Sequence, residues 1–278
     1  MSRSNVIQPV SVGEIGIGPG SPLALIAGPC VIESRDHTLR LAEAIAKVAA
    51  DLDIPLIFKA SYDKANRSSI NSYRGPGLDA GLAVLNEVKS QIGCPLTSDL
   101  HDVSQAGPAG QVLDLLQIPA FLCRQTDLVI AAAKTGKALN LKKGQFMSPA
   151  EMRLAVDKVG SVGGKGVVLT ERGTFFGYGR LVNDMTAIPE MAALAPVVFD
   201  ATHSCQLPGQ GGDKTGGRRD MAPTLARAAI AAGAHALFLE VHDNPSAAKS
   251  DGATVWPLDQ LRPLLESCKR VHDAANAS

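Results

Sequence analysis

Eight short apolar runs recur along the chain, and each is bounded by proline, glycine or a polar cluster. The runs are continuous rather than alternating, which is typical of strands buried on both faces of a parallel sheet. They are Leu23–Ala27, Leu56–Ala60, Leu96–Asp99, Leu115–Ile118, Ala138–Leu141, Val167–Thr170, Val197–Asp200 and Ala236–Glu240. A chain with this pattern is expected to build a parallel sheet whose strands are joined by helices.

Segments with helical periodicity lie between most of these runs. Apolar residues recur at helical spacing through 41–52 and again through 78–92. A third helix is expected to begin at the capping box Ser148-Pro149-Ala150-Glu151 and to end near Gly160. Two more helices are expected over 221–232 and 258–274.

Eight strands that alternate with about eight helices, in 278 residues, predict a (β/α)8 TIM barrel. The alternative is an open, doubly wound sheet. Residues 1–20 precede the first strand, and their valines and isoleucines, punctuated by glycine and proline, predict a short β-hairpin that covers the bottom of the barrel. We therefore expect an N-terminal extension over 1–20 and one barrel domain over 21–278.

The charge balance and the apolar pattern exclude several classes of partner. Basic and acidic residues number 27 each, which argues against nucleic-acid or membrane-surface binding because both need clustered positive charge. The chain begins with no signal-peptide pattern, and its most apolar stretch, 225–241, is too interrupted to span a bilayer. Five cysteines without a C-x-x-C pair disfavour a disulfide framework. A cytoplasmic protein is expected.

Ionisable or hydrogen-bonding residues follow the carboxyl end of every expected strand, whereas the strand starts are mostly proline, glycine or aliphatic. Active sites of (β/α)8 barrels lie at the carboxyl ends of the strands. A solvated loop charge explains any single one of these residues equally well. Eight such strand ends together predict an active site at this end of the barrel, which we call the mouth.

Six residues at the mouth are cations: Lys59, Lys64, Arg67, Arg124, Lys142 and Arg172. Arginine binds phosphate and carboxylate with two parallel hydrogen bonds, and lysine acts as a point charge. The mouth is therefore predicted to bind more than one anion, such as two phosphates and a carboxylate, with the balancing acidic residues elsewhere. For Lys64 and Arg67, an ordinary surface position is the alternative.

Four further mouth residues form a candidate site for a divalent metal ion: Cys30, His203, Glu240 and Asp251. They follow the first, seventh and eighth strands, which are neighbours in a closed barrel. Thiolate, imidazole and carboxylate together suit Zn²⁺, Fe²⁺ or Mn²⁺. The alternatives are a buried small apolar residue for Cys30 and an internally hydrogen-bonded histidine for His203.

A glycine-rich stretch, Pro208 to Arg219, follows the seventh strand. It matches neither a Walker A loop nor the G-x-G-x-x-G fingerprint. So many glycines in one long loop predict a lid over the mouth, and a disordered linker is the alternative.

Several motifs of this chain are similar to those of one enzyme family. The most specific is the run 59–69, which contains Lys64-Ala65-Asn66-Arg67-Ser68. The others are Ser72-Tyr73-Arg74-Gly75-Pro76-Gly77, 119–127, 142–146 and Phe199-Asp200-Ala201-Thr202-His203. Together they resemble 3-deoxy-D-manno-octulosonate 8-phosphate (KDO8P) synthases over roughly residues 20 to 270. The related DAHP synthases, which use erythrose 4-phosphate, carry Lys-Pro-Arg-Thr in place of the first motif.

The resemblance implies a condensation of phosphoenolpyruvate with D-arabinose 5-phosphate and water, which gives KDO8P and phosphate with cleavage of the C–O bond of phosphoenolpyruvate. This reaction belongs to KDO and lipopolysaccharide biosynthesis. The resemblance also implies a homotetramer without an organic cofactor. It assigns phosphoenolpyruvate to Lys59, Lys64, Gln117, Arg124, Lys142 and Arg172. It assigns the sugar phosphate to Asn66, Arg67 and Ser68 with Ser61 nearby, and it places Asp99 and His101 at the mouth.

The family divides by its use of metal. Metal-independent members carry asparagine where Cys30 stands, so Cys30 implies the metal-dependent class, with His203, Glu240 and Asp251 as the other ligands. The run Gln206-Leu207-Pro208-Gly209 agrees with that class. Ser250-Asp251-Gly252-Ala253 departs from it, since metal-dependent members usually have alanine after this aspartate and metal-independent members usually have Cys-Asp-Gly.

Three other functions are compatible with a barrel of this kind. The first is a DAHP synthase on the same fold. The second is an aldolase or lyase that forms a Schiff base with Lys59 or Lys142. The third is a barrel that binds sugar phosphates without turning them over.

Overall fold

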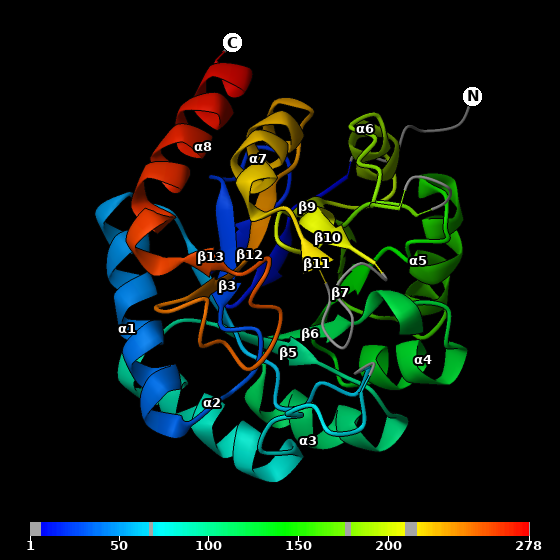
Figure 1. Ribbon diagram of the computed structural model, residues 1–278. Coiled ribbons are helices and arrows are strands. Elements are labelled where there is room, and N and C mark those ends of the chain that lie inside the picture. The colour runs from blue at the N-terminus through cyan, green and yellow to red at the C-terminus, as the bar shows by residue number, and fades with distance from the viewer. Residues whose placement is uncertain (1–6, 67–68, 176–178, 209–215, 278) are drawn as a thin grey trace, which may run out of the picture.

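The computed structural model describes residues 7–66, 69–175, 179–208 and 216–277. Eight parallel strands form its centre (Figure 1). They are β3 (Ala24–Gly28), β4 (Leu56–Lys59), β5 (Leu96–Asp99), β6 (Leu115–Ile118), β7 (Ala138–Lys142), β8 (Val167–Glu171), β9 (Val197–Asp200) and β12 (Ala236–His242). Because β12 pairs with both β3 and β9, the sheet closes on itself. The predicted barrel is confirmed, and the open sheet is excluded.

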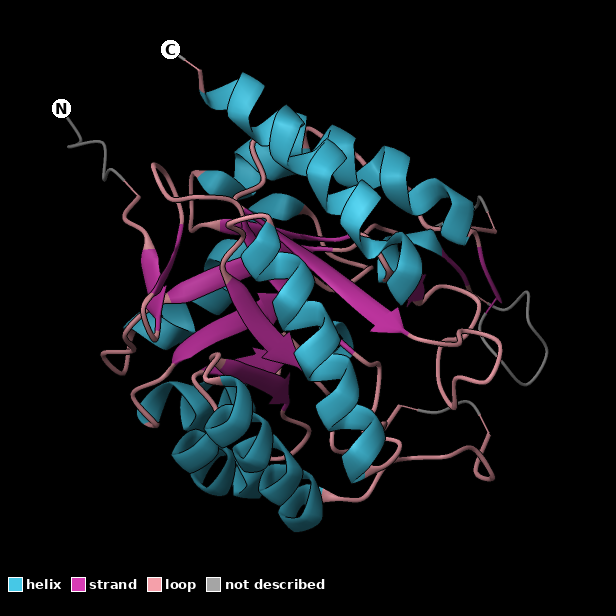
Figure 2. Ribbon diagram, turned by 90° about the vertical axis from the view of Figure 1, so that its left-hand side faces the viewer, coloured by secondary structure: helices cyan, strands magenta, loops and turns pink. Residues whose placement is uncertain are grey.

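Helices surround the barrel on its outside, as Figures 1 and 2 show. They are α1 (Arg35–Asp51), α2 (Leu78–Ile92), α3 (Ala106–Val112), α4 (Thr126–Lys134), α5 (Met152–Gly160), α6 (Ala187–Ala192), α7 (Ala222–Ala231) and α8 (Leu261–Asn276). The five helices expected from periodicity are all present. The capping box of Ser148 and Glu151 forms as predicted and starts a 3-10 turn that leads into α5.

The continuous apolar runs arise because each strand is buried on two faces. Side chains that point outward, such as Leu25, Phe58 and Leu239, pack against the helices. Side chains that point inward form a separate cluster inside the barrel, which includes Ile26 and Phe238. The two sets alternate along each strand, as the period of two requires.

The inward side chains change from apolar to polar between the two ends of the barrel. At the bottom they are aliphatic, and a hairpin of β1 (Val10–Val12) and β2 (Ile15–Ile17) seals this end. Val12 and Ile17 of the hairpin are fully buried against the first residues of the strands. The predicted hairpin is confirmed, and it closes the end of the barrel opposite the mouth.

Three short strands lie at the mouth. Strands β10 (Gln206–Leu207) and β11 (Gly216–Gly217) pair antiparallel, and β13 (Trp256–Pro257) continues the sheet beside β12. Residues 209–215, on which the lid and linker interpretations mainly rest, lie outside the described residues. Among the helices that the structure describes, none is both long and apolar enough to cross a membrane.

Candidate active site

A large cavity opens at the mouth of the barrel. Its volume is about 940 Å³, which is within the range of pockets that bind small molecules. Many of the residues selected from the sequence line it: Lys59, Lys64, Asn66, Asp99, His101, Gln117, Lys142, Arg172, His203, Glu240 and Asp251. The cavity therefore lies at the end of the barrel where the polar strand ends predicted an active site.

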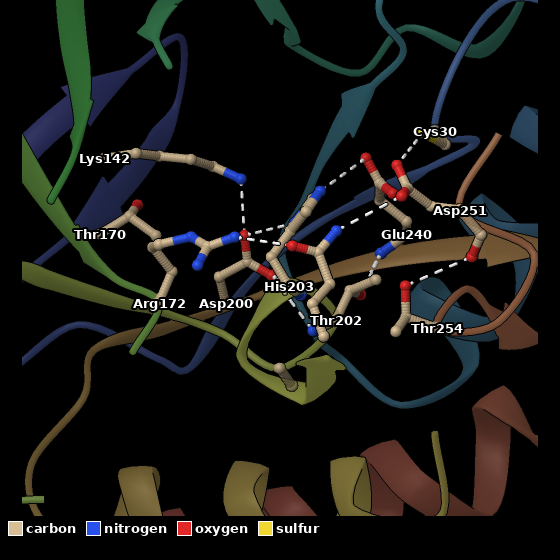
Figure 3. Close-up of polar contacts among 12 residues, drawn as sticks. Cys30, Lys142, Thr170, Arg172, Asp200, Thr202, His203, Glu240, Asp251 and Thr254 are labelled. Atoms are coloured by element: carbon tan, nitrogen blue, oxygen red, sulfur yellow. Dashed lines mark hydrogen bonds and ion pairs between the residues drawn. The ribbon is translucent and has the colours of Figure 1, made fainter. Parts of the chain in front are cut away.

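One side of the cavity gathers the candidate metal ligands (Figure 3). Ligand atoms of Cys30, Glu240 and Asp251 lie within 4.8 Å of one another. The Cys30 thiol lies 3.0 Å from Asp251 Oδ2 and 2.8 Å from the hydroxyl oxygen of Ser250. Burial, together with the carboxylates of Asp251 and Glu240, raises the pKa of this thiol well above its usual value. A bound cation would reverse that effect, because it favours the thiolate.

His203, the fourth candidate ligand, comes from the loop after β9 and is not part of the group whose ligand atoms all lie within 4.8 Å of one another. Its Nδ1 lies 2.7 Å from Asp200 Oδ2, and its Nε2 lies 3.7 Å from Glu240 Oε1. A carboxylate that holds Nδ1 fixes the ring so that Nε2 can bind a metal. Asp200 also accepts hydrogen bonds from the backbone N–H groups of Thr202 and His203, so the carboxylate is itself fixed.

A close approach of two strands places Cys30 beside Lys59. Gly28 ends β3, and a Cβ at this position would lie 1.9 Å from the carbonyl oxygen of Lys59. Glycine therefore allows β3 and β4 to approach closely at the mouth. The Lys59 ammonium group then donates to the Cys30 carbonyl at 2.8 Å.

Glu240 is the carboxylate at which the lysines and the metal ligands meet. Its Oε1 accepts a hydrogen bond from Lys59 Nζ at 2.6 Å, and Lys64 Nζ lies 3.6 Å from the same oxygen. Burial alone raises the pKa of Glu240, but Lys59, Lys64 and His203 outweigh it, so the pKa lies well below its usual range. Glu240 Oε2 is buried and has no hydrogen-bond partner among the described residues.

Lys142 and Arg172 lie on the other side of the cavity. Lys142 Nζ is 2.6 Å from Asp200 Oδ2 and 3.6 Å from the centre of the Phe238 ring. Arg172 is buried and donates to Gln206 Oε1 at 2.9 Å. Burial lowers the pKa of both cations, and Asp200 opposes this effect. Both cations line the cavity, and their contacts with Asp200 and Gln206 hold them in place.

Asp99 and Gln117 extend the site across β5 and β6. Asp99 accepts hydrogen bonds from the Ser61 hydroxyl, at 2.5 Å, and from the Gln117 side-chain amide. Burial raises the pKa of Asp99, but Lys59 and Lys64 lower it further than burial raises it, so the carboxyl group stays ionised. The neighbouring His101 is largely buried, and burial lowers its pKa.

The charges of this site differ from the sequence-based expectation of a cationic mouth balanced by acids elsewhere. Four buried or largely buried cations meet four carboxylates in or directly under the cavity: Lys59, Lys64, Lys142 and Arg172 against Asp99, Asp200, Glu240 and Asp251. The physical reason is that a buried ammonium group needs an ionised partner. This set is formally neutral before any ligand binds.

Comparisons with known proteins agree with this site. The model of the DAHP synthetase I family matches residues 5–276. The chain belongs to the DAHP synthetase I family. A relative from Trichlorobacter lovleyi is 56% identical over 92% of this chain and 95% of its own length. Relatives from Koribacter versatilis and Desulfosudis oleivorans are 54% and 53% identical over at least 96% of both chains. All three are named 2-dehydro-3-deoxyphosphooctonate aldolase, another name for KDO8P synthase.

Some residues that the KDO8P synthase motifs predicted to bind substrate or metal are not among the described residues that line the cavity. Arg124 is exposed and is not among the described residues that line the cavity. Arg67 and Ser68 lie outside the described residues. Ser61 and Cys30 are buried directly behind the lining, where they contact Asp99 and Asp251.

Four polar residues in or beneath the cavity were not predicted as site residues from the sequence: Asn140, Thr170, Asp200 and Gln206. Asp200 ends β9, and its carboxylate contacts both His203 and Lys142. Gln206 bridges the two sides of the cavity, because it accepts from Arg172 and its amide lies 3.3 Å from Asp251 Oδ1. The signal for Asp200 was its inward position, two residues after Val198 in a strand with period two.

A second group of potential ligands lies behind the metal set. Ligand atoms of Glu33, His37 and His242 are within 4.8 Å of one another. Hydrogen bonds engage two of these residues, since His242 Nδ1 accepts from the Asn244 N–H at 2.9 Å and Glu33 Oε1 accepts from the Lys249 N–H at 2.8 Å. These bonds join the start of α1 to the loop that follows β12, which is a structural role.

Proposed function

We propose that this member of the DAHP synthetase I family is a KDO8P synthase, which condenses phosphoenolpyruvate with D-arabinose 5-phosphate and water to give KDO8P and phosphate. The observation that carries the proposal is that the motif residues of that enzyme family line one cavity of about 940 Å³. Relatives over nearly the whole chain bear the name of the same enzyme.

Phosphoenolpyruvate is assigned to the buried cations of the floor, Lys59, Lys64, Lys142 and Arg172, with Gln117 beside them. The three lysines are held by ion pairs and Arg172 by a hydrogen bond to Gln206 before substrate arrives, so these groups need little rearrangement to stabilise the charge of an anion. Arg172 Nη1 is buried without a hydrogen-bond partner among the described residues. This N–H group is suited to donate to a phosphate or carboxylate oxygen.

Arabinose 5-phosphate is assigned to the more open part of the cavity. Asn66 is exposed there and lines the cavity, and the motif adds Arg67 and Ser68 to the sugar-phosphate set, whereas Arg124 is assigned to phosphoenolpyruvate. Asp99 and His101 also line the cavity. The two substrates would thus be held side by side, which lowers the entropic barrier to their reaction.

A divalent metal ion, zinc, iron or manganese, is proposed at Cys30, His203, Glu240 and Asp251. The donor set fits, because it offers sulfur, nitrogen and oxygen ligands, a fixed imidazole and a buried carboxylate oxygen without a partner. A doubly charged cation would also leave the formally neutral site with a net positive charge for anions. The chemistry that such an ion supplies is polarisation of the sugar aldehyde or activation of the attacking water.

The side chains of the protein have defined tasks in this scheme. Lys142 and Arg172 neutralise the phosphoenolpyruvate anion, and Asp200 holds both Lys142 and His203 in place. Lys59 spans Glu240 and the Cys30 carbonyl, so it joins the metal set to the substrate floor. A cytoplasmic homotetramer without an organic cofactor is proposed with this function, following the enzyme family.

The test is product analysis with two sugars. Purified protein supplied with a divalent metal, phosphoenolpyruvate and arabinose 5-phosphate should release phosphate and form a product with the mass of KDO8P. Erythrose 4-phosphate should give little phosphate, and preference for it would assign the chain to the DAHP synthases instead. Covalent trapping of substrate on Lys59 or Lys142 by borohydride would favour a Schiff-base enzyme.

A further inference from the structure

A chain of polar side chains crosses the inside of the barrel beneath the cavity. Asp99, Gln117 and Asn140 are direct partners in the adjacent strands β5, β6 and β7. Thr170 of β8 donates to Asn140 Oδ1 at 2.5 Å, and Asn140 Nδ2 donates to Gln117 Oε1 at 3.0 Å. Gln117 Nε2 in turn donates to Asp99 Oδ1. Burying polar side chains at a barrel centre costs free energy that apolar side chains would not cost. This chain of hydrogen bonds is therefore expected to serve something other than stability.

Every hydrogen bond in the chain runs in the same direction, toward Asp99. The ionised Asp99 carboxylate can only accept, so the NH2 group of Gln117 must face it. The Gln117 carbonyl oxygen then needs a donor, which the Asn140 NH2 group provides. The Asn140 carbonyl oxygen takes its proton from the Thr170 hydroxyl. Each side chain fixes the orientation of the next.

The orientation of Gln117 matters because this residue lines the cavity and Asn140 and Thr170 are not among the described residues that do. With the present orientation, the Gln117 NH2 group donates to Asp99, and its second N–H is the one that would donate to an anion in the cavity. A flipped amide would place its oxygen against the Asp99 carboxylate and against a bound anion. Both contacts would be repulsive.

We propose that Asn140 and Thr170 are positioning residues that fix the Gln117 amide as an N–H donor to phosphoenolpyruvate and hold Asp99 in its reactive orientation. The inference rests on the proposed function, since it takes phosphoenolpyruvate as the anion. Neither residue touches the substrate. Both act through Gln117, and their effect is on binding and turnover rather than on the fold.

The barrel contains a matched control for this role. Thr97 of β5 points inward like Thr170, and both side chains are completely buried. The Thr97 hydroxyl has no hydrogen-bond partner among the described residues. The Thr170 hydroxyl, by contrast, donates the first bond of the hydrogen-bond chain, to Asn140. Thr170→Val and Thr97→Val therefore remove the same group at the same burial, and they differ only in whether that group belongs to the chain.

The experiment measures kcat, the KM for phosphoenolpyruvate, its dissociation constant by calorimetry and the melting temperature. Thr170→Val should lower kcat/KM for phosphoenolpyruvate by about 10- to 100-fold and weaken its binding, as a misplaced substrate contact does. Thr170→Ser should restore wild-type values because it keeps the hydroxyl. Thr97→Val should behave like the wild type.

Equal kinetic losses in Thr170→Val and Thr97→Val, or wild-type kinetics in Thr170→Val, would overturn the inference. If Thr170→Val does not fold, Thr170→Ala is compared with Thr97→Ala by the same criteria. A wild-type protein that binds phosphoenolpyruvate but does not react with arabinose 5-phosphate would refute the proposed function alone. The dissociation constants of the variants would then still decide the positioning role.

Discussion

At the scale of single residues, the site is held together by shared carboxylates: Glu240 contacts Lys59 and Lys64, and Asp200 contacts Lys142 and His203. Lys59, His203 and Glu240 were found because they stand at strand ends. Asp200 is named in a motif but is not assigned to the site by the sequence, although it contacts both His203 and Lys142. Its role depends on which neighbours the barrel closure brings to it, and that information is not present in the local sequence.

Asp200 provides the first prediction at this scale. Asp200→Asn removes the charge that orients the His203 ring, so affinity for Zn²⁺ should fall by about 10- to 100-fold. Competition against a chromophoric chelator measures that affinity. Asp259→Asn, which removes an exposed carboxylate far along the chain, is the control. If both variants bind Zn²⁺ as tightly as the wild type, Asp200 does not support a metal site.

Asp99 provides a prediction about pH. Burial raises its pKa, but Lys59 and Lys64 lower it more, so the folded-state pKa lies below the unfolded value of about 3.9. Its attraction to Lys59 and Lys64 therefore stabilises the fold above about pH 4, and this contribution is lost progressively as the pH falls below that value. By pH 3 the loss should be on the order of 1 kcal/mol.

Denaturant unfolding at several values between pH 6 and pH 3 measures this effect. The free energy of unfolding of the wild type should fall with acidification more steeply than that of Asp99→Asn, which has no carboxyl group to protonate at this position. Parallel curves for the two proteins would show that Asp99 does not carry the effect.

At the scale of elements, the strands were predictable and the shorter helices were not. Burial on both faces makes each strand a continuous apolar run. The ends of every predicted run differ by no more than about two residues from the ends of the observed strand. Helix α6 has only six residues, too few for a periodic pattern to be recognised. The pairing of β12 with β3 links the two ends of the chain, which local patterns do not specify.

The N-terminal hairpin provides a prediction for an element. Ile17 is fully buried against the bottom layer of the barrel, so Ile17→Ala should lower the free energy of unfolding by about 2–5 kcal/mol. The kinetic constants should stay unchanged, because the hairpin lies at the opposite end of the barrel from the cavity. Ile15→Ala, at a partly buried position of the same hairpin, should cost less. Loss of activity in folded Ile17→Ala would contradict a purely structural role.

At the scale of the whole molecule, the zero net charge of the protein is repeated in the active site, where buried cations and carboxylates are equal in number. The sequence predicted a mouth of excess positive charge, whereas the structure pairs Lys59, Lys64 and Lys142 with carboxylates and matches the buried cations of the site with as many acidic side chains. A neutral, prearranged site does not by itself favour two phosphorylated substrates. A divalent ion at Cys30, His203, Glu240 and Asp251 would supply the missing positive charge, which makes metal dependence the central claim of the proposed function.

Phosphate release from phosphoenolpyruvate labelled with ¹⁸O at its bridging oxygen tests that claim most directly. With arabinose 5-phosphate and a divalent metal, the labelled oxygen should appear in inorganic phosphate, because the C–O bond breaks. A chelator should abolish the release, and adding the metal back should restore it. Full activity in metal-free protein, or phosphate without the label, would contradict the account.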